Sequence, residues 1–221
     1  MSGKIGYEIF PDRFHSSYKK NNTKNWNEKV QEKPEGLHQF DFYGGDIRGI
    51  IQKLDYLKSL NIDFLYFTPV FCANTNHRYD CTDFINVDPM LGTEEEIKEL
   101  IEKLHSLNIR VVFDAVFNHI SKDHRWVEEK KDYILKNNGK ITYWCNVANL
   151  PELNLENEEL RNVLWKGSNS VIKKWMDIGV DDWRIDCAYE FGYKFCREIT
   201  ETAHKNGNHK VIGEIWSYPQ K

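Results

Sequence analysis

The chain has 221 residues, of which 40% are hydrophobic and 29% charged; this composition supports a sizeable core and excludes a disordered chain. Its formal net charge of −4 argues against nucleic acid as a partner, because a phosphate backbone selects a basic face. No apolar run approaches the ~18 residues that span a bilayer, and the first residues lack the apolar core of a signal peptide. We therefore expect no membrane partner. Five cysteines without a Cys-x-x-Cys pair predict neither a disulfide framework nor a zinc ribbon, so we expect a reducing, cytoplasmic location.

The first part of the chain predicts two strands and one helix. Residues 5–10 form an apolar run that predicts a strand. Apolar residues recur at helical spacing through 47–60 and end at the four residues Ser-Leu-Asn-Ile, 59–62. The apolar run 62–67 is short and nearly continuous, as is typical of a strand buried on both faces.

The same four residues, Ser-Leu-Asn-Ile, occur again at 106–109, which reveals an internal repeat. Thr93 and Glu96 have the spacing of a capping box, so a helix is predicted to begin there and to end before 106–109. The apolar run 109–113 then predicts the third strand. The repeat therefore consists of a helix followed by a strand.

Two further units follow with less sequence identity. Helical spacing through 158–178 ends at a glycine, and residues 180–185 predict the fourth strand. A helix near 189–206 precedes the fifth strand at 211–212. Alternation of this kind predicts parallel strands joined by right-handed crossovers, in one α/β domain without an internal linker.

Two long irregular segments remain, at about 11–45 and 118–157. Loops of that length inside a compact domain are usually functional or carry a small subdomain. We expect residues 118–157 to form a small inserted subdomain after the third strand.

Three acidic residues occupy equivalent places in successive units. Asp114, Asp186 and Glu214 lie 6 or 7 residues beyond the residue that ends each preceding helix, so all three fall at the carboxyl ends of strands. Parallel α/β folds place their chemistry at this end. Arg184 lies two residues before Asp186, so both side chains point the same way and the guanidinium should keep the carboxylate ionised. The alternative is that each carboxylate only caps the next helix, and Asp186 is the most exposed to it.

These residues lie within a family signature. The segments FDAVFNH (113–119), DDWRIDCAYE (181–190) and VIGEIW (211–216) resemble successive motifs of the alpha-amylase family of glycoside hydrolases. The similarity is closest to the neopullulanase, cyclomaltodextrinase and maltogenic amylase branch, and it extends over nearly the whole chain. Further segments that carry it are YEIFPDRF (7–14), FYGGDIRGIIQKLDYLKSL (42–60), FLYFTPVF (64–71), HRYDCTDFINVDPMLGT (77–93) and LPELN (150–154).

The resemblance implies a retaining glycosidase mechanism. Asp186 matches the nucleophile, which forms a covalent glycosyl-enzyme intermediate, and Glu214 matches the general acid/base. Such a mechanism needs two carboxyl groups ~5–5.5 Å apart, which adjacent barrel strands can provide. Arg184 matches the arginine that orients the nucleophile. Asp114 and Asn118 are expected to be structural and to hold the loop after the third strand.

The resemblance also assigns substrate contacts. Tyr79 matches the aromatic platform under the sugar whose bond is cleaved, and His119 matches a donor to the hydroxyls of that sugar. His77 and Asp80 flank the platform. In the alternative interpretation Tyr79 only anchors a loop and His119 is a loop histidine with its partners inside the protein. Trp216, just past the predicted acid/base, is a candidate for lining the cleft.

The sequence departs from the family in one respect. No Asn-His-Asp motif, which carries the family's third essential carboxylate, occurs here, and we count about the first five β/α units of a (β/α)8 TIM barrel. The whole chain, 1–221, is therefore expected to be an incomplete catalytic barrel. Its open edges predict self-association or a complementing chain.

The expected function is a retaining glycosidase acting on α-glucosidic bonds of maltodextrin- or starch-like oligosaccharides, with little or no activity as this truncated chain. The alternatives are a catalytically dead carbohydrate-binding remnant, a split-barrel assembly partner, and a transglycosylase that uses the same residues. No cofactor is predicted: the Gly44-Gly45-Asp46 segment lacks the spacing of a phosphate loop. Calcium is compatible with the family, but no Asp/Asn cluster here identifies a site, and no metal ligands are assigned.

Overall fold

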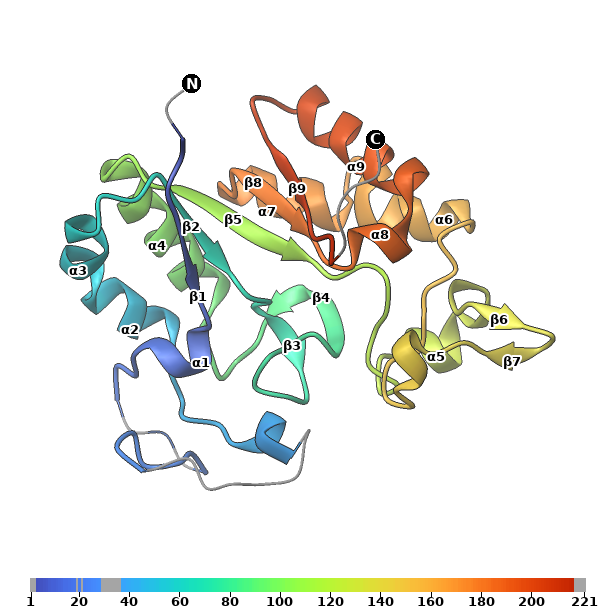
Figure 1. Ribbon diagram of the computed structural model, residues 1–221, viewed down its shortest axis with the longest axis horizontal. Helices are drawn as coiled ribbons and strands as arrows, with labels where there is room; N and C mark the ends of the chain where they lie inside the picture. Colours follow the sequence, from blue (N-terminus) through green and yellow to red (C-terminus); the bar gives the residue numbers. More distant parts are fainter. Residues whose placement is uncertain (1–2, 19, 21, 29–36, 217–221) are drawn as a thin grey trace.

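Five parallel strands form the central sheet of the computed structural model, which describes residues 3–18, 20, 22–28 and 37–216 (Figure 1). The strand order is the order along the chain, and every neighbouring pair is parallel, as the repeat predicts. The strands are β1 (Gly6–Ile9), β2 (Phe64–Phe67), β5 (Arg110–Ala115), β8 (Asp182–Ile185) and β9 (Val211–Gly213). The predicted α/β class is confirmed.

The helices pack on one face of this sheet. Alternation along β2 shows the division: Leu65 and Phe67 are buried beneath the helices, whereas Phe64 and Tyr66 point to the opposite face and are half-buried. Helix α4 (Glu94–Ser106) begins at the predicted capping box. The Thr93 side chain accepts from the backbone N–H of Glu96, and the Glu96 side chain accepts from the backbone N–H of Thr93. Four other helices precede or follow strands: α2 (Ile47–Gln52), α3 (Leu54–Ser59), α7 (Val171–Ile178) and α9 (Tyr193–Lys205).

Three of the predicted helices are shorter than expected because each is interrupted. The helix expected over 47–60 divides into α2 and α3 at Lys53. The helix expected over 158–178 consists of α6 (Glu158–Arg161), a π-helical turn over 162–166, and α7, which restarts where Ser170 accepts from the backbone N–H of Lys173. The helix expected over 189–206 divides into α8 (Ala188–Phe191) and α9 at Gly192, whose φ of 88° ends a helix.

An aromatic cluster ties a hairpin to the sheet and to α7. The hairpin consists of β3 (Phe71–Ala73) and β4 (Cys81–Val87), which are antiparallel. The ring centroids of Phe71 and Phe113 lie 5.5 and 5.6 Å from that of Trp175, which is fully buried as its helical spacing predicts. The Trp175 indole also donates to the backbone carbonyl of Phe84 on β4 at 3.3 Å. The hairpin is therefore fixed to the helix layer, and it carries the loop with Tyr79.

The segment after β5 leaves the sheet and returns to it, and Figure 1 shows it as an arm beside the strand ends. It contains α5 (Trp126–Glu129), the short strands β6 (Lys136–Asn137) and β7 (Lys140–Ile141), and 3-10 turns at Lys131–Tyr133 and Trp144–Asn146. Its ends are joined by antiparallel bridges between His119 and Glu152 and between Ile134 and Leu153. That residues 118–157 form a subdomain stays a prediction.

The segment between β1 and α2 folds around buried carboxylates. It begins with α1 (Pro11–Phe14), and the Asp12 carboxylate accepts from the backbone N–H groups of Tyr43 and Gly44. Asp46 caps α2 by accepting from Gly49 and forms an ion pair with Lys20.

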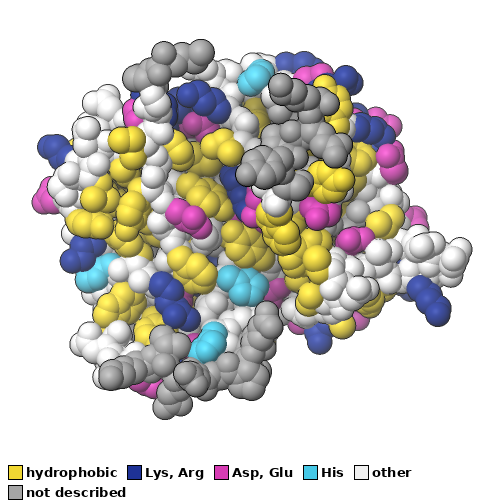
Figure 2. Space-filling view, in the orientation of Figure 1, with side chains coloured by type: hydrophobic (Ala, Val, Ile, Leu, Met, Phe, Trp, Pro, Cys, Tyr) yellow, Lys and Arg dark blue, Asp and Glu magenta, His cyan; other side chains and the backbone are white. Residues whose placement is uncertain are grey.

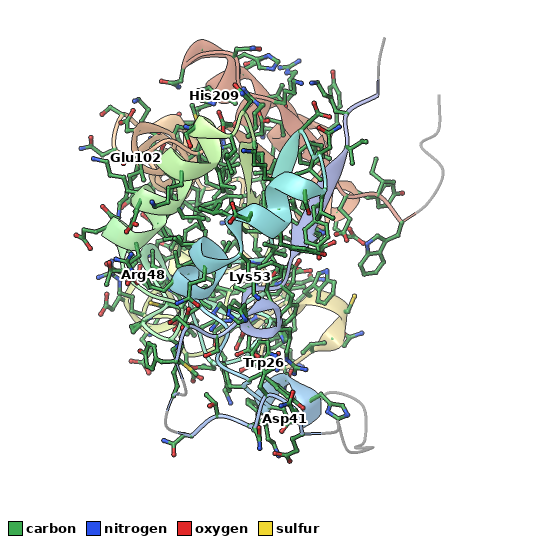
Figure 3. The ribbon with its side chains drawn as sticks, turned by 90° about the vertical axis from the view of Figure 1, so that its left-hand side faces the viewer. Trp26, Asp41, Arg48, Lys53, Glu102 and His209 are labelled. Atoms are coloured by element: carbon green, nitrogen blue, oxygen red, sulfur yellow. The ribbon has the colours of Figure 1, made fainter. Side chains whose placement is uncertain are left out.

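Figure 3 shows the molecule from the side, with Trp26 and Asp41 of the segment between β1 and α2 at one end and His209, just before β9, at the other. The two ends correspond to the carboxyl and amino ends of the strands. Arg48 of α2, also labelled there, pairs with Glu96 of α4 at 2.8 Å and so links two neighbouring helices.

Among the helices described, none has the length and apolar character needed to cross a membrane.

Candidate active site

The strand register brings four charged side chains to one end of the sheet. Asp114 on β5 is the direct neighbour of Arg184 on β8, and Arg184 is in turn the neighbour of Ile212 on β9. Asp186 and Glu214 lie two residues beyond Arg184 and Ile212, so they point to the same face one step further along. The three acidic residues that the repeat places at strand ends therefore meet, as predicted.

Arg184 is the centre of this cluster. Its Nη1 lies 2.8 Å from both carboxylate oxygens of Asp114 and 2.8 Å from Oδ1 of Asp186. Its Nη2 lies 2.7 Å from Oε1 of Glu214. The expected contact between Arg184 and Asp186 is confirmed, and the same guanidinium also holds the other two carboxylates. One positive charge thus faces three acidic groups.

None of the three carboxylates caps a helix of the described residues. The residue before α8 is Cys187, which lies in the left-handed region (φ 49°, ψ 42°) and makes no side-chain cap. This turn places its thiol 3.2 Å from Oδ2 of Asp186, to which it donates, while its backbone N–H donates to Oε2 of Glu214 at 3.0 Å. Asp114 is likewise engaged by groups on neighbouring strands, so the capping interpretation is wrong for Asp114 and Asp186, whereas for Glu214 the residues that would follow lie outside those described.

The cluster shifts the pKa values of its acids in different directions. Burial raises the pKa of Asp114 to about 7, against the opposing effect of Arg184. Burial also raises the pKa of Asp186, which Arg184 and the Cys187 thiol partly offset. The pKa of Glu214 is lowered: burial opposes the change, but hydrogen bonds from Trp216 and the Cys187 N–H and the charge of Arg184 outweigh it. Glu214 is the most exposed of the three, with 27% of its side chain accessible.

Two tyrosines lie against the guanidinium. The Arg184 carbon Cζ is 5.9 Å from the ring centre of Tyr79 and 5.8 Å from that of Tyr66. The Tyr66 hydroxyl donates to Oδ2 of Asp114 at 2.5 Å and lies 3.4 Å from the Tyr79 hydroxyl. Asp114 therefore contacts side chains of neighbouring strands, and the expectation that it holds the loop after β5 is wrong.

His119 lies beside the carboxylates in a buried position. Only 2% of its surface is exposed, and its Nε2 has no hydrogen-bond partner among the described residues. Burial lowers the pKa of this imidazole to about 4, so the ring is neutral at pH 7. The indole of Trp144, on the arm after β5, stacks on it with ring centroids 5.0 Å apart, and the exposed Trp216 lies edge-on to Trp144 at 6.3 Å.

The residues that flank Tyr79 hold its loop. The His77 Nδ1 accepts from the backbone N–H of Tyr79 at 3.1 Å, and Asp80 accepts from the hydroxyl of Thr75. The backbone carbonyl of Asn118 accepts from the backbone N–H of Leu153 at 2.9 Å and so joins the segment after β5 to the returning end of the arm; that the Asn118 side chain holds this loop stays a prediction.

A buried ion pair that the sequence analysis did not identify fixes the loop of Tyr79 further. Arg78 is fully buried in the left-handed region (φ 62°), and its Nε lies 2.7 Å from Oδ2 of Asp88. Its Nη1 donates to the backbone carbonyl of Asn76 at 2.7 Å. The tyrosine is therefore presented from a rigid turn.

Tyr66, Trp144 and Cys187 belong to the site but were not singled out in the sequence. For Tyr66 a signal existed, because it lies two residues before Thr68, the position equivalent to the three acids, and so shares their face. Trp144 lies in an irregular segment, where no periodicity reports on the direction of its side chain.

In the view of Figure 2, hydrophobic side chains surround a few charged and histidine side chains near the middle of the open face.

Comparison with known proteins shows which family the chain resembles. Residues 8–148 match the family described as alpha amylase, catalytic domain. The chain is 34% identical over 236 residues to a cyclomaltodextrinase of Thermoanaerobacter pseudethanolicus, covering 95% of this chain and 39% of that protein. It is 31% identical over 232 residues to neopullulanase 2 of Thermoactinomyces vulgaris, covering 95% and 38%.

A solved structure shows the same fold. The structure of a cyclic α-maltosyl-(1→6)-maltose hydrolase of Arthrobacter globiformis in complex with maltose superposes with a TM-score of 0.84 at 29% identity, over 98% of this chain and 52% of that one. The five-stranded sheet therefore matches the N-terminal part of an alpha-amylase-type TIM barrel. The chain spans about two-fifths of the length of the sequence relatives described above.

Proposed function

This chain belongs to the alpha-amylase family of glycoside hydrolases, and from that premise we propose that its cluster of carboxylates carries a retaining cleavage of α-glucosidic bonds in maltodextrin-like oligosaccharides. In this proposal Asp186 is the nucleophile and Glu214 the general acid/base. The relative in complex with maltose supports a maltose-type ligand. The proposal applies to the cytoplasm, where the free cysteines stay reduced.

One observation carries the proposal: a single guanidinium holds both proposed catalytic carboxylates, at 2.8 Å for Asp186 and 2.7 Å for Glu214. Two carboxyl groups on the terminal nitrogens of one arginine are close neighbours, which suits the double displacement of a retaining enzyme. The other oxygen of Asp186, Oδ2, is not among the atoms that Arg184 contacts, and among the described residues its hydrogen-bond partner is the weak thiol donor of Cys187. That oxygen is the one we propose attacks the anomeric carbon.

Two further groups suit a sugar in this place. The Nε2 of His119 and the Nε1 of Trp144 are buried polar atoms without a hydrogen-bond partner among the described residues. A buried polar atom without a partner is costly unless a ligand supplies one, and a sugar hydroxyl can both donate and accept a hydrogen bond. The face of Tyr79 next to them offers a stacking surface for the same sugar.

The lowered pKa of Glu214 opposes the role of acid, because an ionised carboxylate cannot protonate a leaving oxygen. The causes are hydrogen bonds from Trp216 and the Cys187 N–H and the charge of Arg184; burial opposes them but is incomplete, because 27% of the side chain is open to water. A sugar seated above Glu214 would remove that water and raise its pKa, as desolvation does for Asp114 in the same cluster. We therefore propose that the acid form arises on substrate binding.

The nucleophile is tested by covalent trapping with an activated fluorinated α-glucoside. We expect a sugar adduct, located by peptide mass spectrometry on Asp186, and no adduct in D186N. The matched control is D177N, which changes an exposed aspartate of α7 that pairs with Lys173; it should trap as the unchanged protein does. An adduct at full stoichiometry in D186N, or on another residue, means the assignment is wrong.

Calorimetry with maltose oligomers separates this proposal from its alternative. Binding without release of reducing ends or of transfer products favours a carbohydrate-binding remnant. Turnover with transfer products in place of hydrolysis favours a transglycosylase that uses the same residues.

A further inference from the structure

A cluster of three possible metal ligands lies inside the carboxylate site. The Nε2 or Nδ1 of His119, an oxygen of Asp186 and the Sγ of Cys187 all lie within 4.8 Å of one another, and all three residues are buried. Cys187 has no part in the proposed sugar chemistry. We propose that His119, Asp186 and Cys187 form a binding site for one thiophilic divalent cation of the zinc class.

The backbone turn at Cys187 creates the site. Because Cys187 adopts a left-handed conformation, its side chain folds back toward the preceding residue, and Sγ comes to 3.2 Å from Oδ2 of Asp186. Ligand atoms on a tetrahedral zinc lie roughly 3.3–3.7 Å apart, since Zn–S is about 2.3 Å and Zn–N and Zn–O about 2.0–2.2 Å. Two of the three ligand atoms are therefore already within a few tenths of an ångström of the required separation.

His119 supplies the independent observation that a ligand is missing. Its Nε2 is buried and unpartnered, although 98% of the residue surface is withdrawn from water. A neutral imidazole presents one nitrogen lone pair, which is the form that binds metals. The ligand atom of His119 lies within 4.8 Å of the other two, so a shift of about 1 Å or less brings all three to tetrahedral dimensions.

The donor types select the class of cation. One thiolate, one imidazole and one carboxylate suit Zn²⁺, Co²⁺ or Cd²⁺, whereas Ca²⁺ and Mg²⁺ require oxygen ligands in larger number. The two anionic ligands balance the charge of a divalent ion. The guanidinium of Arg184, which contacts the other oxygen of Asp186, opposes binding electrostatically and makes the site weaker than a structural zinc site.

Binding changes the thiol in a defined way. The S–H bond of Cys187 breaks, a sulfur–metal bond forms, and one proton passes to the buffer. The ion also takes Oδ2 of Asp186. If the proposed nucleophile is right, a zinc-loaded chain is therefore an inhibited chain, with Cys187 as the residue that makes it sensitive.

The test uses Co²⁺ alone as an optical probe, so its readout does not depend on glycosidase activity. We expect one Co²⁺ per chain with thiolate-to-cobalt charge-transfer absorption in the near ultraviolet, displaced by Zn²⁺. The substitution C187A should abolish that absorption and weaken Co²⁺ binding by roughly 100-fold or more, since even loss of an indirect partner costs 10–100-fold. The control C145A removes an exposed thiol elsewhere and should change neither.

Absorption that persists in C187A, or that disappears in C145A, overturns the proposal. X-ray absorption at the zinc edge on the unchanged protein gives a second measurement that needs no variant. One sulfur among the ligands supports the site, and a shell of nitrogen and oxygen alone overturns it.

Discussion

The backbone N–H of Cys187 donates to Oε2 of Glu214 at 3.0 Å. The residue directly after one strand-end carboxylate therefore holds the carboxylate of the next strand. This bond crosses the ends of β8 and β9 and does not require that Glu214 be ionised, only that it keep an acceptor oxygen.

Glu214→Gln and Glu214→Ala are accordingly expected to differ in stability while both lose turnover. The glutamine keeps an oxygen for the Cys187 N–H, whereas the alanine leaves that donor without its partner, at a cost of about 0.5–1.5 kcal/mol relative to glutamine. Urea unfolding of the two variants measures the difference. Equal midpoints would show that the bond contributes nothing to the fold.

Arg184→Ala should be among the most destabilising changes in the sheet. It leaves three acidic groups, Asp114, Asp186 and Glu214, without their shared cation, and the loss of one partner from a buried ion pair costs about 3–5 kcal/mol. Arg184→Lys keeps the charge but not the planar fork, so an intermediate loss is expected. The exposed pair of Arg197 with Glu201 provides the control, since R197A should cost less than about 1 kcal/mol.

Because the pKa of Asp114 is raised, its contribution to the free energy of unfolding is expected to fall as the pH rises from about 4 to 7. Burial raises its folded pKa to about 7, above the value of 3.8 that an exposed aspartate has, so folding favours the protonated form. Between about pH 4 and 7 the folded state holds a proton on Asp114 that the unfolded state has lost, so the contribution of this group to stability decreases with rising pH in that window. Thermal unfolding across the window should show the stability of the unchanged protein falling relative to that of D114N as the pH rises. A difference between the two proteins that does not change with pH contradicts this assignment.

The lowered pKa of His124 makes a contribution of the opposite slope over nearly the same pH range. Burial lowers its folded pKa to about 4, so between about pH 6.5 and 4 the unfolded state binds a proton that the folded state does not. The contribution of His124 to stability is fully present above that window and is lost as the pH falls through it. The lowered pKa of His119 adds a pH dependence of the same sign. Because His124 Nδ1 accepts from the backbone N–H of Trp126, H124N keeps an acceptor there while it removes the titration. Denaturant midpoints for H124N should depend less on acid than those of the unchanged protein, and an unaltered dependence contradicts the prediction.

Gly45→Ala tests the close approach of two chain segments. A Cβ at Gly45 would lie 2.0 Å from the backbone carbonyl oxygen of Pro11, and backbone atoms cannot yield as a flexible side chain can. We expect a loss of about 1–3 kcal/mol in unfolding free energy. Gly3, where a Cβ meets nothing within 4 Å, gives the matched control, and G3A should leave the unfolding midpoint in place.

The sequence predicted the strands well and the helices less well, for a physical reason. An apolar run such as 109–113 is stable as a strand that is covered on both faces, and the structure forms β5 over these residues. A helical pattern such as 158–178 survives a local interruption without losing its periodicity, so the break at Gly167 and the new cap at Ser170 left no trace in the spacing.

The candidate site was also predicted only in part from the sequence. Residues on strands, such as Arg184 and Asp186, were placed correctly because the period of two fixes their direction. The role expected of Asp114 was wrong because its partners, Tyr66 and Arg184, lie on other strands, and no pattern within one segment reports on contacts between segments.

The pairing of Asp114 with Arg184 also constrains how the protein is made. The two residues are 70 positions apart, so at about 5–20 residues per second the ribosome delivers the aspartate roughly 4–14 s before its cation. During that interval β5 has β2 beside it but not β8, and the carboxyl group of Asp114 can be buried only as an uncharged acid or left in water. Closure of this end of the sheet must therefore follow synthesis of the fourth strand, and the nascent chain presents an open, apolar sheet edge to chaperones until then.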